Sequence, residues 1–189
     1  VSTAKYFFPR ILGEYKKFNP NVDIDLFVGN REEIFQRLEK NLDDFVIMGE
    51  PPSSDEYQKK LICQDELLVV AHKNRGFSSI NRPLSSLKDE MWLLREGGSG
   101  TFKLMKKIFS KYEFHAKKHM TIRHNEAIKQ MLLADLGVSI LSRRSVKSEL
   151  DSGELVIIPV IGFPVKHPWF VVYHSEKVLR GTVKKFMTR

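Results

Sequence analysis

Residues Leu94–Lys106, with the sequence LREGGSGTFKLMK, read as the end of a strand, a glycine turn and the first turns of a helix. The turn contains three glycines, Gly97, Gly98 and Gly100. Glycine permits positive φ angles and a close approach of the backbone to a ligand. Because a hydroxyl oxygen at a helix start accepts a bond from a free backbone N–H, Ser99 or Thr101 is expected to cap this helix.

A helix start with free N–H groups is a natural binding place for a carboxylate or phosphate. Small polar residues follow four predicted strand ends: Ser2 and Thr3, Asn30 and Arg31, Ser99 to Thr101, and His124 and Asn125. Ligands of open α/β sheets bind beyond the carboxyl ends of the strands. These residues, with Gly98, are therefore predicted to line one anion site. The alternative is ordinary capping, since each helix needs one polar cap in any case.

Two arginines lie close to these helix starts. Arg31 and Arg95 are predicted to make bidentate contacts to a carboxylate or phosphate. For Arg31, an exposed arginine in the first helical turn is the alternative. Asn30 is expected to cap the same helix, and Glu33, three residues later, completes the pattern of a capping box.

Hydrophobic spacing along the chain predicts alternating strands and helices. The predicted strands are Val1–Ala4, Val22–Gly29, Asp44–Gly49, Lys60–His72, Met91–Arg95, His119–His124, Val138–Leu141, Leu155–Val160 and Trp169–Tyr173. The predicted helices are Tyr6–Phe18, Arg31–Lys40, Leu84–Glu90, Thr101–Tyr112, one that Asn125 caps and Gly137 closes, Ser145–Leu150 and Glu176–Arg189.

Alternation of this kind favours parallel sheets in an α/β fold. The 189 residues fit two Rossmann-like lobes joined by two crossing strands, Lys60–His72 and Trp169–Tyr173. Lobe I is predicted over residues 1–70 and 168–189, and lobe II over residues 71–167.

Composition excludes several function classes. No apolar run approaches the roughly 18–20 residues of a membrane span. The sequence has no GxSxG, HExxH or Walker A lysine, so it is not expected to be an enzyme, and neither a cofactor nor a metal is predicted. His115 and His119 have the spacing of a helical zinc pair, but a surface histidine pair is the favoured interpretation.

The charge and the cysteine count indicate partners and compartment. The net charge of +8 favours anionic partners, although the denser lysine groups at Lys103–Lys118 and Lys177–Arg189 are expected to be solvated helix faces. The single cysteine, Cys63, excludes an internal disulfide and suits a reducing compartment, so a cytoplasmic location is expected.

The chain resembles the effector-binding domain of LysR-type transcriptional regulators, in the subgroup that controls carbon-dioxide-fixation operons. The matching stretches are VSTAKYFFP (1–9), NRE (30–32), DDFVIMGEPP (43–52), LREGGSGT (94–101), NEAIKQ (125–130), LGVSILSR (136–143) and GFP (162–164). They run in order across nearly the whole chain. One departure is GGSGT at 97–101, where the family pattern has PGSGT.

This resemblance implies a fold like that of type 2 periplasmic binding proteins, with an effector cleft between two lobes. It also implies an N-terminal winged helix-turn-helix, absent from this fragment, through which promoter DNA is bound. Homodimers or tetramers are expected, paired through the helices at Arg31–Lys40 and Thr101–Tyr112. The implied ligands are anionic metabolites such as phosphoglycolate, sugar bisphosphates or NADPH.

The resulting hypothesis is an effector sensor that controls transcription of carbon-metabolism genes. An anion bound in the cleft by Thr101, Asn125, Ser2 and Thr3 would favour one lobe angle, and so change the spacing of the DNA-binding heads. A periplasmic solute-binding protein of the same fold is the main alternative. An enzyme on this fold is a second, because fold does not fix function.

Overall fold

The chain forms two compact units. The structure, a computed structural model, describes residue 6 and residues 8–187. Unit 1 comprises Val1–Gln64 and Pro168–Arg189, and unit 2 comprises Asp65–His167. The chain passes between the units within two strands, β2 (Tyr57–His72) and β7 (Val165–His174). The division expected from the sequence differs by residues 65–70, and the predicted strand Val1–Ala4 lies outside the described residues.

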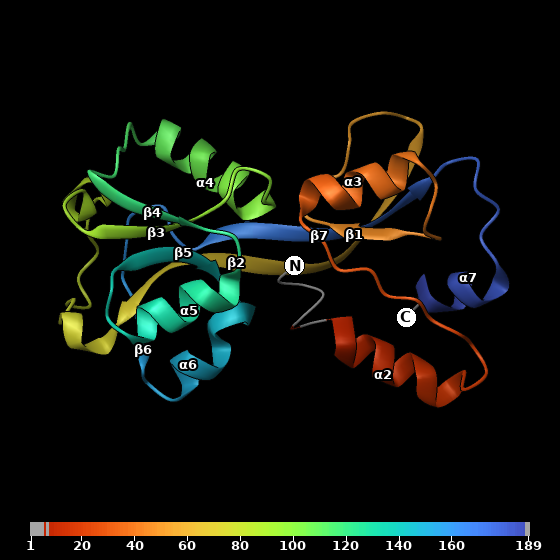
Figure 1. Ribbon diagram of the computed structural model, residues 1–189, viewed down its shortest axis with the longest axis horizontal. Helices are drawn as coiled ribbons and strands as arrows, with labels where there is room; N and C mark the ends of the chain where they lie inside the picture. Colours follow the sequence, from red (N-terminus) through yellow and green to blue (C-terminus); the bar gives the residue numbers. More distant parts are fainter. Residues whose placement is uncertain (1–5, 7, 188–189) are drawn as a thin grey trace. The chain divides into compact units, whose positions relative to one another are not determined.

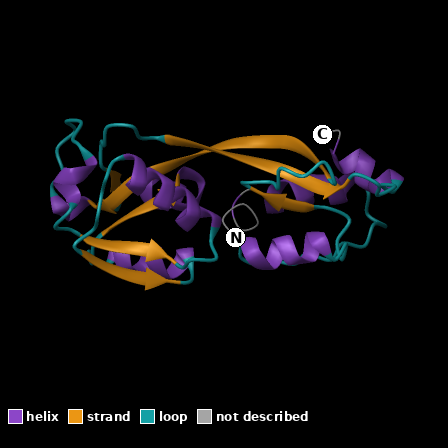
Figure 2. Cartoon of the chain, turned by 90° about the horizontal axis from the view of Figure 1, so that it is seen from above, coloured by secondary structure: helices purple, strands orange, loops and turns teal. Residues whose placement is uncertain are grey.

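Helices and strands alternate over most of the chain (Figure 2). Besides its parts of β2 and β7, unit 1 contains α2 (Phe8–Phe18), α3 (Arg31–Glu39), β1 (Val46–Met48) and α7 (Gly181–Met187). Unit 2 contains η1 (Lys73–Arg75), η2 (Leu84–Leu87), β3 (Met91–Arg95), α4 (Gly100–Lys111), β4 (Lys118–Ile122), α5 (Asn125–Leu133), β5 (Val138–Ser142), η3 (Arg143–Val146), α6 (Lys147–Asp151) and β6 (Leu155–Ile157). In the described residues, no helix has the length and apolar character needed to cross a membrane.

The sheet of unit 2 is mixed, so the expectation of parallel sheets is only partly correct. β3 pairs in parallel with both β4 and β5, whereas β2 pairs antiparallel with β5 and with β6. The connection from β2 to β3 contains only the short helices η1 and η2. A parallel pair is usually joined by a crossover helix, and no α-helix lies in this connection.

Alternating side chains of the unit 2 strands build two cores, one on each face of the sheet. Leu67, Val69, Trp92 and Leu94 pack with Met105 and Ile108 of α4. The intervening Leu68, Val70 and Leu93 pack with Ile128 and Leu132 of α5. Figure 1 accordingly shows α4 on one face of this sheet and α5 and α6 on the other. The three layers fix where α4 and α5 begin.

The end of α5 differs from the sequence prediction. Its C-cap is Ala134, and the next residue, Asp135, has a φ of 57°. Gly137 therefore does not close the helix. It lies against β3, where a Cβ atom would meet the carbonyl oxygen of Met91 at 2.1 Å. Glycine is required at this position because the backbones of two elements approach closely.

Unit 1 packs α3 against an antiparallel pair of strands. β1 pairs with β7 from Val46↔Val172 to Met48↔Phe170. Leu38 of α3 is buried against this pair. The predicted strand Val22–Gly29 is not formed: it is an extended loop, because none of the described strands pairs with it. This loop lines a cavity of about 1220 Å³ within unit 1, together with residues of α2 and α7.

Candidate functional site

Two helices of unit 2 begin at the same edge of its sheet. β3 and β4 are parallel, and Arg95 at the end of β3 lies opposite Ile122 at the end of β4. α4 starts five residues after Arg95, and α5 starts three residues after Ile122 (Figure 1). Because the carboxyl ends of parallel strands meet at one edge, the positive ends of both helix dipoles lie there.

The start of α4 carries the predicted cap. Ser99, 4% exposed, accepts a hydrogen bond on its Oγ from the Phe102 N–H at 3.0 Å, so capping by Ser99 is confirmed. Gly100 is the first helical residue and Thr101 the second. Gly97 does not use the left-handed backbone that glycine permits. No described group accepts the N–H of Gly100 or Thr101, so α4 offers two donors beside the partly buried Gly98.

The start of α5 lacks a side-chain cap. His124 holds the N-cap position, is exposed, and makes no capping hydrogen bond through its side chain. The prediction that Asn125 caps this helix is therefore wrong. Asn125 is instead the first helical residue, 3% exposed, and its Oδ1 accepts a hydrogen bond from Nη1 of Arg95. This hydrogen bond joins α5 to β3.

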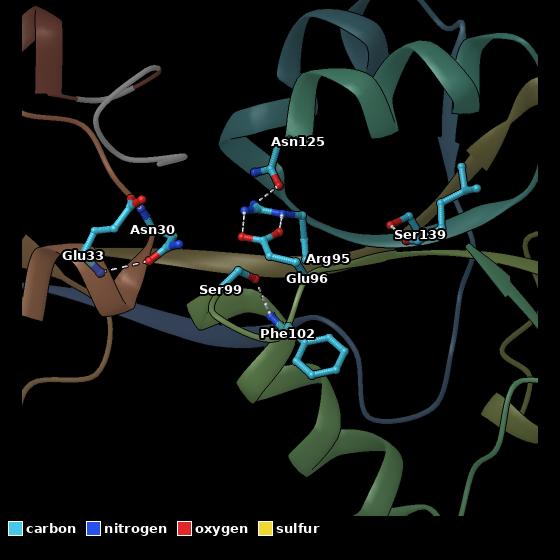
Figure 3. A network of polar contacts seen from close by, with 9 residues as sticks. Asn30, Glu33, Arg95, Glu96, Ser99, Phe102, Asn125 and Ser139 are labelled. Carbon is cyan, nitrogen blue, oxygen red and sulfur yellow. Dashed lines mark hydrogen bonds and ion pairs between the residues drawn. The ribbon is translucent and has the colours of Figure 1, made fainter. Parts of the chain in front are cut away.

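Arg95 is bound on two sides by protein groups. Its Nε and Nη2 donate to the two carboxylate oxygens of Glu96, at 2.9 and 3.0 Å. Figure 3 shows the guanidinium between Glu96 and Asn125. Sequence reasoning named Arg95 but missed Glu96, although a glutamate directly after a strand-end arginine was the available signal. The buried positive charge is thus already neutralised by a carboxylate.

A buried serine holds the strand that carries this arginine. Ser139 of β5, 1% exposed, donates its hydroxyl hydrogen to the Leu93 carbonyl at 2.6 Å (Figure 3). Within β3, the Trp92 Nε1–H donates to the Leu87 carbonyl at 2.9 Å, and its ring packs against Phe109 of α4. These contacts fix the position of β3 relative to β5 and α4, and so the place of Arg95.

The unit 1 residues predicted for the site form a local cap. Asn30 accepts from the Glu33 N–H at 3.0 Å, and Glu33 accepts from the Asn30 N–H at 2.7 Å, which confirms the capping box. Nη2 of Arg31 donates to the Glu50 carbonyl at 3.3 Å, while its buried Nε has no hydrogen-bond partner among the described residues. Ser2 and Thr3 lie outside the described residues.

Further along α3, a bidentate ion pair fixes the helix to the loop before β1. Arg37 donates to Asp43 at 2.6 and 2.8 Å, and this hydrogen bonding raises the pKa of Arg37. Arg37 also lies over the ring of Phe27. The positive charge of Arg37 is therefore paired with Asp43 inside unit 1.

The described residues contain no group of three or more His, Cys, Asp or Glu that could hold a metal ion. His115 and His119 are both exposed, one in a loop and the other in β4, so they do not share a helix face. The polar groups at the β3–β4 edge are backbone N–H donors, the hydroxyls of Ser99 and Thr101, and Arg95, whose charge is neutralised by Glu96. Such a set binds an anion through hydrogen bonds.

Comparison with known proteins gives a consistent family. A family model described as the LysR substrate binding domain matches residues 1–189. The RuBisCO operon transcriptional regulator of Acidithiobacillus ferrooxidans is 38% identical over 189 residues, with 99% of this chain and 61% of the relative covered. The HTH-type transcriptional activator CmpR of Synechocystis is 36% identical over 188 residues, covering 99% of this chain and 62% of that protein. The chain thus spans about three fifths of these curated relatives.

Solved structures give the same fold. The regulatory domain of CcmR from Synechocystis PCC6803, solved in complex with 2-PG, has a TM-score of 0.89 and 32% identity, with 99% of this chain and 90% of that chain covered. Full-length BenM has a TM-score of 0.82 at 18% identity, with 99% of this chain and 62% of that chain covered. The second likeness shows the fold alone.

Proposed function

We propose that this chain, which belongs to the LysR substrate-binding domain family, is the effector-sensing part of a DNA-binding transcriptional regulator of carbon-metabolism genes. The family expected from the sequence motifs is confirmed. The observation that supports sensing is that the N-termini of α4 and α5 lie at the same β3–β4 edge of unit 2, where no described group accepts the N–H of Gly100 or Thr101. Small anionic metabolites, phosphorylated or carboxylated, fit that edge.

In this proposal the anion accepts hydrogen bonds from the N–H groups of Gly100 and Thr101 and from the first turn of α5. The hydroxyls of Ser99 and Thr101 lie at the same helix start as donors of further bonds. Gly98, Arg95, His124 and Asn125 complete the group in unit 2. Ser2, Thr3, Asn30 and Arg31 remain ligand predictions from the sequence, and the proposal rests on unit 2.

The sensor works by differential affinity. A ligand shifts a conformational equilibrium only if it binds one state more tightly than the other. The regulators to which the chain is similar are longer and are named as helix-turn-helix proteins. We propose that this protein likewise acts in the cytoplasm through an N-terminal DNA-binding domain. We also propose a homodimer or tetramer, because paired DNA half-sites require paired DNA-binding domains at a fixed spacing.

The relatives favour this function over its alternatives. The curated relatives described above carry regulator names, which speaks against a periplasmic solute-binding protein. They also imply a protein that is not an enzyme.

Replacing Thr101 by alanine tests the role of α4. We expect the mutant to bind 2-phosphoglycolate about tenfold more weakly in isothermal titration calorimetry, since a hydrogen bond to a charged group is lost. Ser110→Ala is the matched control, because this exposed hydroxyl lies at the other end of the same helix. Its affinity should equal that of the parent chain. Equal affinities for all three proteins would remove the Thr101 side chain from the site.

A further inference from the structure

The guanidinium of Arg95 is the buried cation nearest in sequence to the start of α4, yet it is not open to a ligand. Its side chain is 4% exposed and carries Glu96 on one edge and Asn125 on Nη1. An arginine presents its donors in a planar fork that matches one carboxylate or phosphate per edge. The edge formed by Nε and Nη2 is occupied by the carboxylate of the next residue.

We infer that Glu96 is a built-in competitor of the effector, a carboxylate that the incoming anion must displace from Arg95. The inference rests on the proposed function and adds a residue that sets the affinity threshold. In this inference the effector takes the Nε and Nη2 donors of Arg95 that Glu96 occupies in the structure, so the two anions cannot be bound there together. The measured affinity is therefore the intrinsic affinity reduced by the cost of removing Glu96 from Arg95.

The local structure allows Glu96 to leave. Its side chain is 19% exposed, whereas that of Arg95 is 4% exposed, so the carboxylate reaches solvent by rotation of its own side chain. Its carbonyl is held by the Ser99 N–H at 3.1 Å, so the backbone stays in place. A Cβ at Gly97 would meet no atom within 4 Å, so the residue that follows Glu96 faces open space.

Asn125 connects Arg95, whose carboxylate partner would be exchanged, to α5. It is the first residue of that helix and accepts from the Nη1 of the same guanidinium. Replacement of Glu96 by a ligand changes the partner on one edge of Arg95 while the contact to α5 is kept. The N-terminus of α5 is therefore hydrogen-bonded to Arg95, the side chain that would exchange Glu96 for the ligand.

Two Glu96 variants separate competition from a simple charge effect. Glu96→Asp keeps the charge but shortens the side chain by one methylene, so the bidentate pair is weakened while the field at the site persists. Glu96→Gln removes the charge as well. Glu113→Gln is the matched control, since it removes an exposed charge just past the far end of α4, outside the proposed site.

Calorimetric titration of each chain with 2-phosphoglycolate provides the readout. We expect Glu96→Gln to bind about 10- to 100-fold more tightly than the parent, and Glu96→Asp about fivefold or more, because a charge-assisted bond is weakened. Glu113→Gln should change affinity about twofold, as exposed charges do. In an Arg95→Lys background the gain from Glu96→Gln should fall to that of Glu113→Gln, because an ammonium cannot form the two-bond pair.

Glu96→Asp decides the outcome: an affinity equal to that of the parent overturns the competitor role. Should one Glu96 variant not fold, the other is compared with Glu113→Gln, and equal changes overturn the inference. If no form of the chain binds 2-phosphoglycolate, the proposed function falls with it. If the parent binds and Glu96→Asp binds no more tightly, the competitor role alone falls.

Discussion

Replacing Lys129 by methionine is expected to lower the free energy of unfolding by about 3–5 kcal/mol, because it leaves a buried carboxylate without its cation. Lys129 lies in α5 and its side chain is 7% exposed. Its Nζ is 2.9 Å from Oε1 of Glu149 in α6 and 3.2 Å from Oε1 of Glu126. Glu149 is itself mostly buried. Urea denaturation followed by circular dichroism measures the loss.

Two further proteins test the reason for that loss. Lys147→Met removes an exposed lysine of α6 that pairs with Asp151, and it should cost less than about 1 kcal/mol. The double variant Lys129→Met with Glu149→Leu removes both charges of the buried pair, and it should recover most of the stability. If the double variant is as unstable as Lys129→Met alone, lost packing of the lysine stem is the cause, and the ion pair is not.

Replacing Gly137 by alanine is the second change with a large expected effect. The added Cβ would lie 2.1 Å from the carbonyl oxygen and 3.0 Å from the carbonyl carbon of Met91, so the β3 backbone must move. We expect a loss of about 3 kcal/mol in the free energy of unfolding, at the upper end of overpacking effects. Differential scanning calorimetry should show a lower melting temperature for unit 2.

Gly13→Ala is the matched control for this substitution. Gly13 lies inside α2, where a Cβ would meet no atom within 4 Å. Alanine there should stabilise the chain by about 0.5–1 kcal/mol, because glycine is a poor helix former. A Gly137→Ala chain that unfolds with the stability of the parent would contradict the close approach of residue 137 to β3.

Local signals in the sequence predicted the local parts of the site. Ser99 and Asn30 cap helices as expected because their capping partners lie three residues away, at Phe102 and Glu33. The strand before the glycine turn, β3, has the predicted bounds Met91–Arg95. The family was found from motifs that run along the chain in order.

Features that depend on distant partners were not predictable in this way. The stretch Val22–Gly29 has strand-like alternation, but a strand also needs a neighbour, which the described residues do not supply. Asn125 has the composition of a cap, yet Arg95, thirty residues earlier, takes its side-chain oxygen. The pairing of Arg95 with Glu96 is a local exception: adjacent residues of a strand point to opposite faces, and Glu96 lies just past the end of β3.

The central claim is that the N-termini of α4 and α5 bind an anion, and backbone amide chemical shifts test it most directly. Titration of the ¹⁵N-labelled chain with 2-phosphoglycolate should move the amide resonances of Gly100, Thr101 and Glu126 most, and saturate at one affinity for all three. Saturable shifts confined to amides elsewhere in the chain, with these three unmoved, would contradict the claim.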